Sequence, residues 1–595
     1  MVLAPEKSLR WDLSPLYPAI DSPALADDMQ AIARDAQAFA DAFRGRVATL
    51  GPSELRDALH ALEAFNARMM RIHGFAMLAF STDTQSPAAK DLLDKTRTWG
   101  TELHNLLQFF DLEIKAIPEA DFHRLLTASE LSKYRYFLAR ERKFAPHTLT
   151  EPEERLMALK AITGDAAWSQ LYEEISALIR VSVEVDGELK ELTLEEARAL
   201  ATHPDRALRE RARKAVMTAF AERSHVLTFI FNTVYQDHAQ DVALRHYPSA
   251  MAPTLLGDDL DPKVIDALMT AVEAAYPLAQ RYFTLKAKAL GLTDFASFDT
   301  LAPYAQTERV VSFAEGRDLV MAAFESFSPD FARIAHGFFE QRRIDVPPEP
   351  GKRGGAFCAG LGPELPAYVL LNWTDRLDDV STLAHELGHG IHFVLAGEAQ
   401  SPFNYHPITP LAETASTFGE IVLSNHLLAQ EKDPAVRLQL LANRLEDAIG
   451  TIFRQVMYTR WELNAHARRA EGVVSAEEFS DLWMAEHRKF YGDAVRLLES
   501  DRWGWSSIPH IVLYRFYCYS YAFGQLLVYA LYQHYRDQGP DFVPKLLDVL
   551  RAGGSAPPQE ILTGVGVDIT DPGFWSKGLK LVEGMLSEFE AALPA

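Results

Sequence analysis

The residues best suited to chemistry are two histidines and a glutamate in the run His385-Glu386-Leu387-Gly388-His389. On a helix, positions i and i+4 lie on one face, so the imidazoles of His385 and His389 can bind the same metal ion. Glu386 lies about 100° further round the helix axis, beside that ion rather than on it. This placement suits a general base that acts on water at the metal. The pattern therefore predicts one catalytic zinc ion per chain.

A catalytic zinc needs a third protein ligand. The downstream candidates are His392, Glu398, His406, Glu413 and Glu420. His392 follows His389 by three positions, but three ligands from one helix would crowd the ion. Glu413 is favoured, because Thr409-Pro410 predicts the start of a second helix on which Glu413 and Glu420 share a polar stripe. Glu420 is then expected either to hold an imidazole N–H or to lie on a solvated helix face.

Two glycines, Gly388 and Gly390, fall inside the helix that is expected from Asp378 to Leu395. A glycine in a helix interior costs about 1 kcal/mol relative to alanine, so some neighbour should require the space. A second helix or a substrate backbone lying against this face would do so. The alternative is that the histidines are ordinary core residues of a helical scaffold, and this alternative predicts no bound metal.

The rest of the chain shows mostly helical patterning. Apolar residues recur with the period of an amphipathic helix from Ser22 to Arg44, and similar stretches run from Pro262 to Leu290 and from Ala476 to Tyr491. Strand signals are few: a hairpin from Val181 to Leu192 and a short strand from Gly355 to Leu361. The predicted fold class is therefore mainly α, with a small β-sheet.

The length of 595 residues predicts more than one part. We expect an N-terminal helical domain over 1–200 and a catalytic domain over 201–595, with the seam near His203-Pro204 and no long flexible linker. The segment from Ile511 to Tyr532 is nearly all apolar or aromatic, but it contains Arg515 and six tyrosines. These residues favour a buried helix over a membrane span.

Composition excludes several classes of partner. The net charge of -23 argues against nucleic acid and against an anionic membrane surface. The two cysteines, Cys358 and Cys518, are too few for a disulfide framework, and the first 19 residues lack the pattern of a secretion signal. The expected location is therefore the cytoplasm. The sequence carries no signal of oligomeric state.

Longer stretches resemble oligoendopeptidase F of the thimet oligopeptidase superfamily, and the likeness covers most of the chain. The motifs that carry it are His385-Glu386-Leu387-Gly388-His389-Gly390-Ile391-His392, Ala412-Glu413-Thr414-Ala415-Ser416-Thr417, Trp11 to Tyr17, Gly351 to Phe357 and Phe516 to Gly524. The resemblance implies a zincin-type fold of two helical halves that enclose a deep channel, with zinc on its floor. It also implies that Gly355 to Cys358 offers a strand edge to an extended peptide.

The resemblance further implies His385, His389 and Glu413 as zinc ligands and Glu386 as the base. It places a histidine and tyrosines beside the substrate, here His510, Tyr514 and Tyr517, with Tyr519 or Tyr521 as possible replacements for one tyrosine. Cys358 is expected to be a small packed residue.

The expected activity is zinc-dependent hydrolysis of internal bonds in short, unstructured oligopeptides. The competing hypothesis is a peptide-binding protein that keeps the channel and has lost the chemistry.

Overall fold

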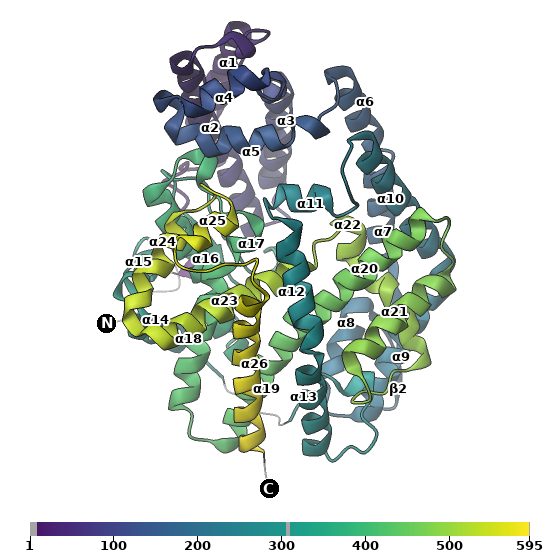
Figure 1. The fold of residues 1–595 in the computed structure, drawn as a ribbon. Helices are drawn as coiled ribbons and strands as arrows, with labels where there is room; N and C mark the ends of the chain where they lie inside the picture. Colours follow the sequence, from purple (N-terminus) through teal and green to yellow (C-terminus); the bar gives the residue numbers. More distant parts are fainter. Residues whose placement is uncertain (1–8, 305–309, 594–595) are drawn as a thin grey trace. The chain divides into compact units, whose positions relative to one another are not determined.

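A computed structural model describes residues 9–304 and 310–593 of the protein (Figure 1). The described chain is mainly helical and contains a two-stranded and a three-stranded sheet, which confirms the predicted fold class. Contacts divide it into two compact units of three stretches each. The first unit comprises Met1–Thr148, Glu308–Ala429 and His534–Val567, and the second comprises Leu149–Thr307, Gln430–Gln533 and Asp568–Ala595.

These units differ from the predicted domains, 1–200 and 201–595. Residue 200 lies inside the second unit. The reason is visible in the core of the first unit. Apolar side chains of its first stretch, such as Phe75 and Leu103, pack in one cluster with Leu361 and Leu370 from its second stretch. The first stretch therefore completes its core with residues from beyond position 200.

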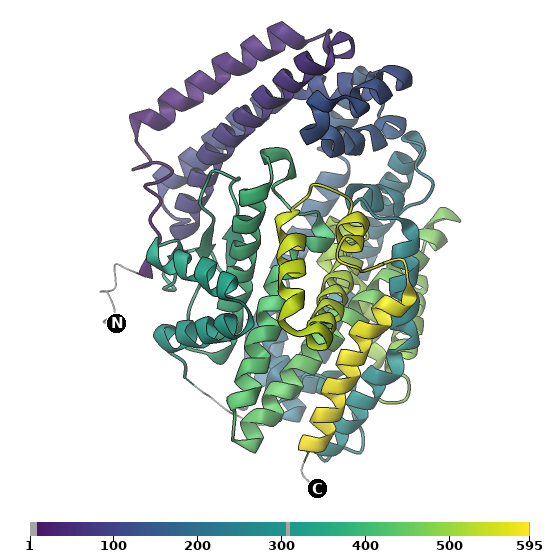
Figure 2. The same cartoon turned by 60° about the vertical axis from the view of Figure 1, so that its left-hand side comes forward.

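The first unit is built mainly from helices. They are α1 (Pro23–Phe43), α2 (Pro52–Thr82), α3 (Pro87–Ala116), α4 (Glu119–Thr127), α5 (Arg135–Lys143), α14 (Phe313–Phe327), α15 (Pro329–Glu340), α16 (Leu377–Ala399), α17 (Thr409–Ala412), α18 (Thr414–Gln430), α24 (Val543–Arg551) and α25 (Pro558–Thr563). The long helices α1 to α3 pack side by side (Figure 2). The helix predicted from Ser22 to Arg44 is confirmed as α1, which begins at a proline and buries one stripe, including Met29, Ile32 and Phe39.

The second unit is also helical. Its helices are α6 (Glu151–Ala161), α7 (Asp165–Leu178), α8 (Leu194–Ala199), α9 (Arg206–Glu222), α10 (Ser224–Leu244), α11 (Ala252–Gly257), α12 (Pro262–Ala274), α13 (Tyr276–Ala289), α19 (Pro434–Ala448), α20 (Arg454–Ala470), α21 (Ala476–Tyr491), α22 (Pro509–Leu513), most of α23 (Tyr519–Gln538) and α26 (Pro572–Ala592). The short segments of both units are η2 (Val47–Thr49), η3 (Ser129–Tyr134), η4 (Ala145–His147), η5 (Leu200–Thr202), η6 (Ser297–Asp299), η7 (Pro402–Asn404), the π-helical turn η8 (Ile449–Phe453), η9 (Glu499–Ser507) and η10 (Gly539–Phe542).

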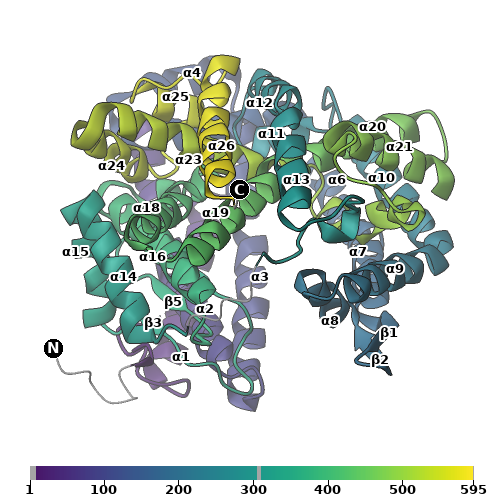
Figure 3. The same cartoon turned by 90° about the horizontal axis from the view of Figure 1, so that it is seen from below.

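The predicted hairpin is confirmed as β1 (Arg180–Val185) and β2 (Glu188–Thr193), which pair antiparallel beside α8 and α9 (Figure 3). The turn residues Asp186 and Gly187 have φ values of 56° and 81°. Two successive positive φ values are typical of a type I′ turn, which the Asp-Gly pair favours.

The three-stranded sheet belongs to the first unit. It has the order β3 (Ile344–Asp345), β5 (Tyr368–Leu370), β4 (Phe357–Ala359). The central strand β5 is fully buried and pairs parallel with β3 and antiparallel with β4. The strand predicted from Gly355 to Leu361 is thus confirmed as the shorter β4. It lies at the edge of its sheet, packed on helix α16.

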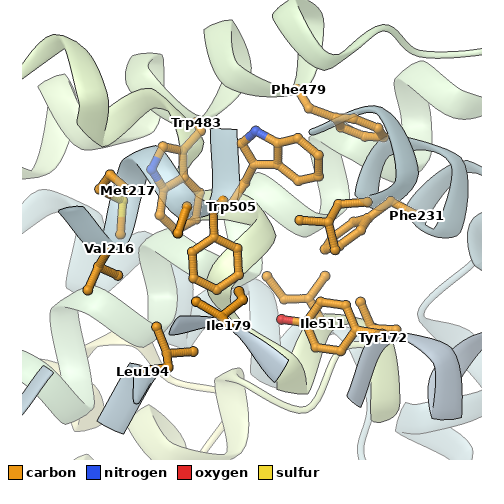
Figure 4. Packing of buried hydrophobic residues seen from close by; sticks show 14 of the residues in the cluster. Tyr172, Ile179, Leu194, Val216, Met217, Phe231, Phe479, Trp483, Trp505 and Ile511 are labelled. Carbon is orange, nitrogen blue, oxygen red and sulfur yellow. The ribbon is translucent and has the colours of Figure 1, made fainter. Parts of the chain in front are cut away.

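The core of the second unit is rich in tryptophan (Figure 4). The rings of Trp461 and Trp505 stack with centroids 6.2 Å apart, and Trp461 meets Trp483 edge-on at 5.6 Å. Each indole N–H has an acceptor, so none of these buried donors is left unpaired. Ile511 and Val512 of α22 belong to the same cluster, so this core anchors the segment that carries His510.

Three segments that the pattern predicts as single helices are broken. The stretch from Pro262 to Leu290 divides into α12 and α13 before Pro277, because proline lacks the N–H that would continue the helix. The helix predicted from Thr409 is interrupted at Glu413, which has φ -86° and ψ 3°. The apolar segment after Ile511 is interrupted between α22 and α23, where Phe516 has φ 56°. Among the described residues, no helix has an apolar run long enough to cross a membrane.

Candidate metal centre and active site

Helix α16 places the two histidines of the motif on one face. Leu383, Leu387 and Ile391 are fully buried on other faces and fix the helix in the first unit. The Nε2 atoms of His385 and His389 lie 3.2 Å apart. Neutral imidazole nitrogens that face each other this closely need a proton or another cation between them.

Glu413 completes the cluster from the break between α17 and α18. Its Oε2 atom lies 3.5 Å from Nε2 of His385 and 3.3 Å from Nε2 of His389. In a tetrahedral zinc site with bonds of about 2.0–2.1 Å, neighbouring ligand atoms lie about 3.3 Å apart. The three atoms therefore fit one tetrahedral ion, and they form the single group of this kind found among the described residues. Ser416 donates a hydrogen bond of 2.7 Å to the same carboxylate.

Close packing of α16 on α18 brings these ligands together. A Cβ atom on Gly388 would lie 2.5 Å from the carbonyl oxygen of Ala415 and 2.5 Å from Cα of Ser416. On the other helix, a Cβ on Gly419 would lie 3.0 Å from the carbonyl oxygen of Ala384. Of the two neighbours expected at Gly388, a second helix or a substrate backbone, the structure places a second helix there. For Gly390 the close neighbour is instead the side chain of Phe338, 2.4 Å from the would-be Cβ.

Glu420 contacts His385 on the side of the ring that faces away from the cluster. Its Oε1 atom accepts from Nδ1 of His385 at 2.9 Å. This bond leaves Nε2 of His385 as the nitrogen free to bind a metal. Of the two expectations for Glu420, the structure favours the one in which it holds an imidazole N–H.

Charge in the cluster favours a bound cation. Burial lowers the pKa of His385, but the hydrogen bond and charge of Glu420, with the charge of Glu413, raise it to about 9. Burial raises the pKa of Glu413, but the hydrogen bond and charge of His389 lower it to about 2. The carboxylates thus hold positive charge at the histidines, and a divalent metal ion can supply that charge in place of protons.

Glu386 lies in the pocket beside these three residues but is not part of their cluster. It is 6% exposed, and burial raises the pKa of its carboxyl group. Among the residues that the structure describes, it has neither a hydrogen-bond nor an ion-pair partner. A carboxylate with free lone pairs next to a metal centre is suited to accept a proton.

The pocket beside the cluster has a volume of ≈ 360 Å³ and includes residues of β4. Phe357 and Cys358 of β4 line it together with His389, so the strand edge and the cluster share one cavity. Burial raises the pKa of the Cys358 thiol well above its usual value, as expected for a packed residue rather than a nucleophile.

The other candidate ligands lie apart from the metal group. His392 is 2% exposed, and burial lowers its pKa to about 3. His406 lines the pocket near Phe393 and faces its ring at 5.7 Å. Glu398 lies on the exposed end of α16 and lines a different cavity with Tyr405.

A second set of polar side chains lies in the second unit, around the break between α22 and α23. The hydroxyl of Tyr521 lies 3.2 Å from Nε2 of His510. The ring of Tyr517 is nearly parallel to that of His510, with centroids 5.9 Å apart. The ring centroids of Tyr514 and Tyr517 lie 6.0 Å apart. Tyr514 is 61% exposed. The structure thus brings His510, Tyr514 and Tyr517 together, and it adds Tyr521.

Tyr519 points elsewhere. It is fully buried, and its hydroxyl donates a hydrogen bond to the Asp258 carboxylate. Of the two tyrosines that the resemblance left as replacements, Tyr521 therefore joins the histidine and Tyr519 does not.

A buried glutamate that is not evident from the sequence shapes this segment. The backbone N–H of Phe516 donates to Oε1 of Glu462 at 2.7 Å, and Phe516 has a φ of 56°, which is uncommon for a bulky residue. Burial raises the pKa of Glu462 to about 8. The Phe516 ring packs against His466, with centroids 4.7 Å apart. The signal in the sequence is a glutamate and a histidine at i and i+4 beside Trp461, on the buried face of α20.

Comparisons with known proteins identify relatives over most of the chain. The model of peptidase family M3 matches residues 199–581, and that of oligopeptidase F matches residues 113–180. An oligoendopeptidase F homolog of Lactococcus lactis subsp. lactis is 28% identical over 554 residues, 91% of each chain. The chromosomal oligoendopeptidase F of Lactococcus lactis subsp. cremoris is 31% identical over 407 residues, which cover 68% of this chain and 67% of that protein.

Solved structures share the fold. A candidate peptidase from Chlamydophila abortus superposes with a TM-score of 0.88 at 24% identity and covers 99% of both chains. Oligoendopeptidase-F from Enterococcus faecium gives a TM-score of 0.72 at 23% identity, with 95% of this chain and 98% of that chain covered.

Proposed function

The chain belongs to peptidase family M3, and on that premise we propose that it is a zinc-dependent endopeptidase that cleaves internal bonds of short, unstructured oligopeptides. The observation that carries the proposal is the convergence of His385, His389 and Glu413 at the spacing of a tetrahedral site, beside the unpartnered Glu386. All these residues lie in the predicted catalytic part, 201–595. The two cysteines are unpaired, in keeping with work in a reducing cytoplasm.

In the proposed mechanism, His385, His389 and Glu413 would hold one zinc ion, and Glu420 orients His385. A zinc ion bound there would act as a Lewis acid, which would lower the pKa of water toward about 7 and polarise a carbonyl group. Glu386 removes the proton from the attacking water and then delivers it to the leaving amine. Its lack of a competing partner keeps both oxygens available for these transfers.

The oxyanion that forms on the scissile carbonyl needs hydrogen-bond donors. We assign this role to His510, Tyr514 and Tyr517. The hydroxyl of Tyr521 is close enough to Nε2 of His510 to fix its tautomer and orientation. The edge strand β4 would add the peptide backbone as a further strand, which recognises an extended chain with little dependence on its side chains.

Replacing Glu413 by glutamine is expected to weaken zinc retention, since a neutral amide is a poorer ligand than a carboxylate. The Glu420→Gln variant should lose affinity by about 10–100-fold, as is usual for a residue that supports a ligand, and Glu413→Gln should lose more. Zinc per chain after dialysis against a graded chelator series measures both. Glu398→Gln, at the exposed end of α16, is the control and should keep its zinc. If Glu413→Gln kept full zinc while Glu420→Gln or Glu398→Gln lost it, the third ligand would be wrongly assigned.

The variants His510→Ala, Tyr514→Phe and Tyr517→Phe are expected to lower kcat more than they raise KM. Each removes a donor whose bond strengthens in the transition state, and one such donor commonly contributes about 10²–10³-fold. Steady-state kinetics on one fluorogenic peptide separates the two parameters. Tyr276→Phe, which removes an unpaired hydroxyl on α13 away from this group, should leave both unchanged. A pure KM effect at all three positions would make them substrate-positioning groups instead.

Folded proteins are expected to be spared, while short peptides are cleaved. The proposed channel, which follows from the family resemblance, admits a single extended chain. A folded loop would have to unfold first, and local opening of a stable region can approach the global stability of about 5–15 kcal/mol. One scissile sequence is tested as a free peptide, within a long disordered chain and within a loop of a folded domain. Cleavage of the folded loop at a rate near that of the free peptide would rule out an enclosed channel.

A mixed peptide library, digested before and after chelation with metal analysis alongside, tests the proposed function directly. Loss of cleavage on chelation and its return with zinc are expected. A metal-replete chain without turnover would revive the peptide-binding alternative, and a chain that binds no metal would revive the scaffold alternative.

A further inference from the structure

The second unit contains a pocket of ≈ 480 Å³ in which the charged lining residues are arginines. Four arginines line it: Arg198, Arg209, Arg213 and Arg454. None of the described residues that line it is an aspartate or a glutamate. The chain as a whole has a net charge of -23, so the charge of this pocket is opposite to that of the whole chain.

Buried acids neutralise only part of this charge. Asp299 accepts from both Arg206 and Arg209, and Asp501 accepts from Arg213 at 2.7 Å. The partner of Arg198 is Glu195, which is 79% exposed and therefore well screened by water. The pocket and its surroundings keep an excess of positive charge.

Arg454 is the arginine in the pocket without a partner among the described residues. It follows the π-helical turn η8, a type of distortion that recurs at functional sites. A Cβ on Gly450 of that turn would lie 2.9 Å from an Nη atom of Arg454, so the glycine makes room for the guanidinium group. Burial raises the pKa of Tyr458, which lines the same pocket, while the charges of Arg454, Arg213 and Arg198 lower it. These three cations therefore act on one point in the pocket.

A hydroxyl group in the lining also lacks a partner. Ser297 is 5% exposed, and its buried Oγ has no hydrogen-bond partner in the described structure. Buried polar atoms are normally satisfied, so an orphaned one in a cavity points to a ligand. The rest of the lining includes Val216, Met217 and Leu301, which suit an aliphatic stem.

We propose that this pocket binds a carboxylate of the peptide substrate, with Arg454 as the main charged contact and the Ser297 hydroxyl as a donor. The link to the substrate is His510, which lines the pocket and which the proposed function places at the reacting carbonyl. The inference therefore rests on that function and adds a preference for acidic peptides. The carboxylate comes from an Asp or Glu side chain or from a free C-terminus.

The test uses the zinc-loaded full chain and pairs of peptides that differ only in charge. One set of pairs carries Glu or Gln at successive positions around the scissile bond, and the other ends in a free carboxylate or an amide. The acidic member of the preferred pair is expected to have a kcat/KM about ten- to a hundredfold higher, the effect of one charge-assisted hydrogen bond. The set that shows the difference identifies the source of the carboxylate.

Variants then locate the preference. Arg454→Gln should bring the acidic-to-neutral ratio close to one, mainly through KM, whereas Arg454→Lys should keep part of it. Ser297→Ala removes an unpaired buried hydroxyl without breaking an internal bond, and it should lower the ratio in a chain of unchanged thermal stability. Arg488→Gln deletes an exposed arginine of α21 outside the pocket and should leave the ratio as it is. Because the ratio compares two substrates of one preparation, partial misfolding of a variant cannot change it.

Equal kcat/KM values for every acidic and neutral pair would overturn this inference and leave the peptidase function standing. A preference that persists in Arg454→Gln would also overturn it. Failure of the native chain to cleave any peptide would overturn the proposed function and, with it, this inference.

Discussion

The Glu386→Gln variant is expected to bind zinc like the native chain and to lose about 10²–10⁴-fold in kcat, the usual cost of removing a general base. A loss larger than this range is consistent with the mechanism, because the same carboxylate is assigned both the removal of the water proton and its delivery to the amine. An amide can do neither. Since the side chain has no hydrogen-bond or ion-pair partner in the described structure, the substitution breaks neither kind of interaction.

Zinc content and kcat must be measured on the same preparation. Glu398→Gln changes the same residue type at the exposed end of the same helix, and it should keep both full zinc and full activity. A Glu386→Gln variant with near-native kcat would remove this residue from the mechanism. A variant that loses its zinc together with activity would instead indicate a role in binding the metal.

Gly388→Ala is expected to destabilise the first unit and to release zinc. The added methyl group would lie 2.5 Å from backbone atoms of Ala415 and Ser416, and backbone cannot rotate away as a side chain can. Helix α18 must therefore shift, and it carries Glu420 and begins next to Glu413. Overpacking of this kind costs on the order of 1–3 kcal/mol, and here it also moves Glu413 and Glu420 away from the two histidines.

The control is Gly100→Ala in the middle of α3, where an added Cβ meets nothing within 4 Å. There the same substitution should stabilise the fold by up to about 1 kcal/mol, because alanine is the better helix former. Thermal unfolding with and without zinc measures the change in stability in each variant and the contribution of bound zinc to it. If Gly388→Ala matched Gly100→Ala in melting temperature and zinc content, the close approach of the two helices would not be needed for the site.

The convergence of His385, His389 and Glu413 was predictable because its geometry is mostly local. The spacing of His385 and His389 depends only on the helical period, and Thr409-Pro410 marks the start of the helix region that brings Glu413 back. A glycine at position 388 lowers helix stability, and this cost alone indicates that a close neighbour requires the space. In each case the signal lies within a few residues of the feature it predicts.

The break after α22 was not predictable in this way. The segment Tyr514 to Cys518 contains neither glycine nor proline, and its apolar run reads as one continuous helix. What opens it is a hydrogen bond from the Phe516 N–H to Glu462, a residue 54 positions away in the sequence. A tertiary contact here overrides local propensity. The roles of His510, Tyr514 and Tyr517 stay predictions until the kinetics are measured.

The interleaving of the two units along the chain has a consequence for biosynthesis. Unit 1 needs the stretch His534–Val567, in which α24 packs against α16, so it cannot close when its first 148 residues leave the ribosome. At roughly 5–20 residues per second, translation of the roughly 385 intervening residues takes roughly 20–80 s. For the first roughly 10–40 s of that interval, until synthesis reaches position 361, the apolar faces of α1 to α3 lack Leu361 and Leu370, their partners in the native core. The nascent chain is therefore expected to need chaperones, and a fragment cut near residue 200 should aggregate or be degraded rather than survive as a stable half.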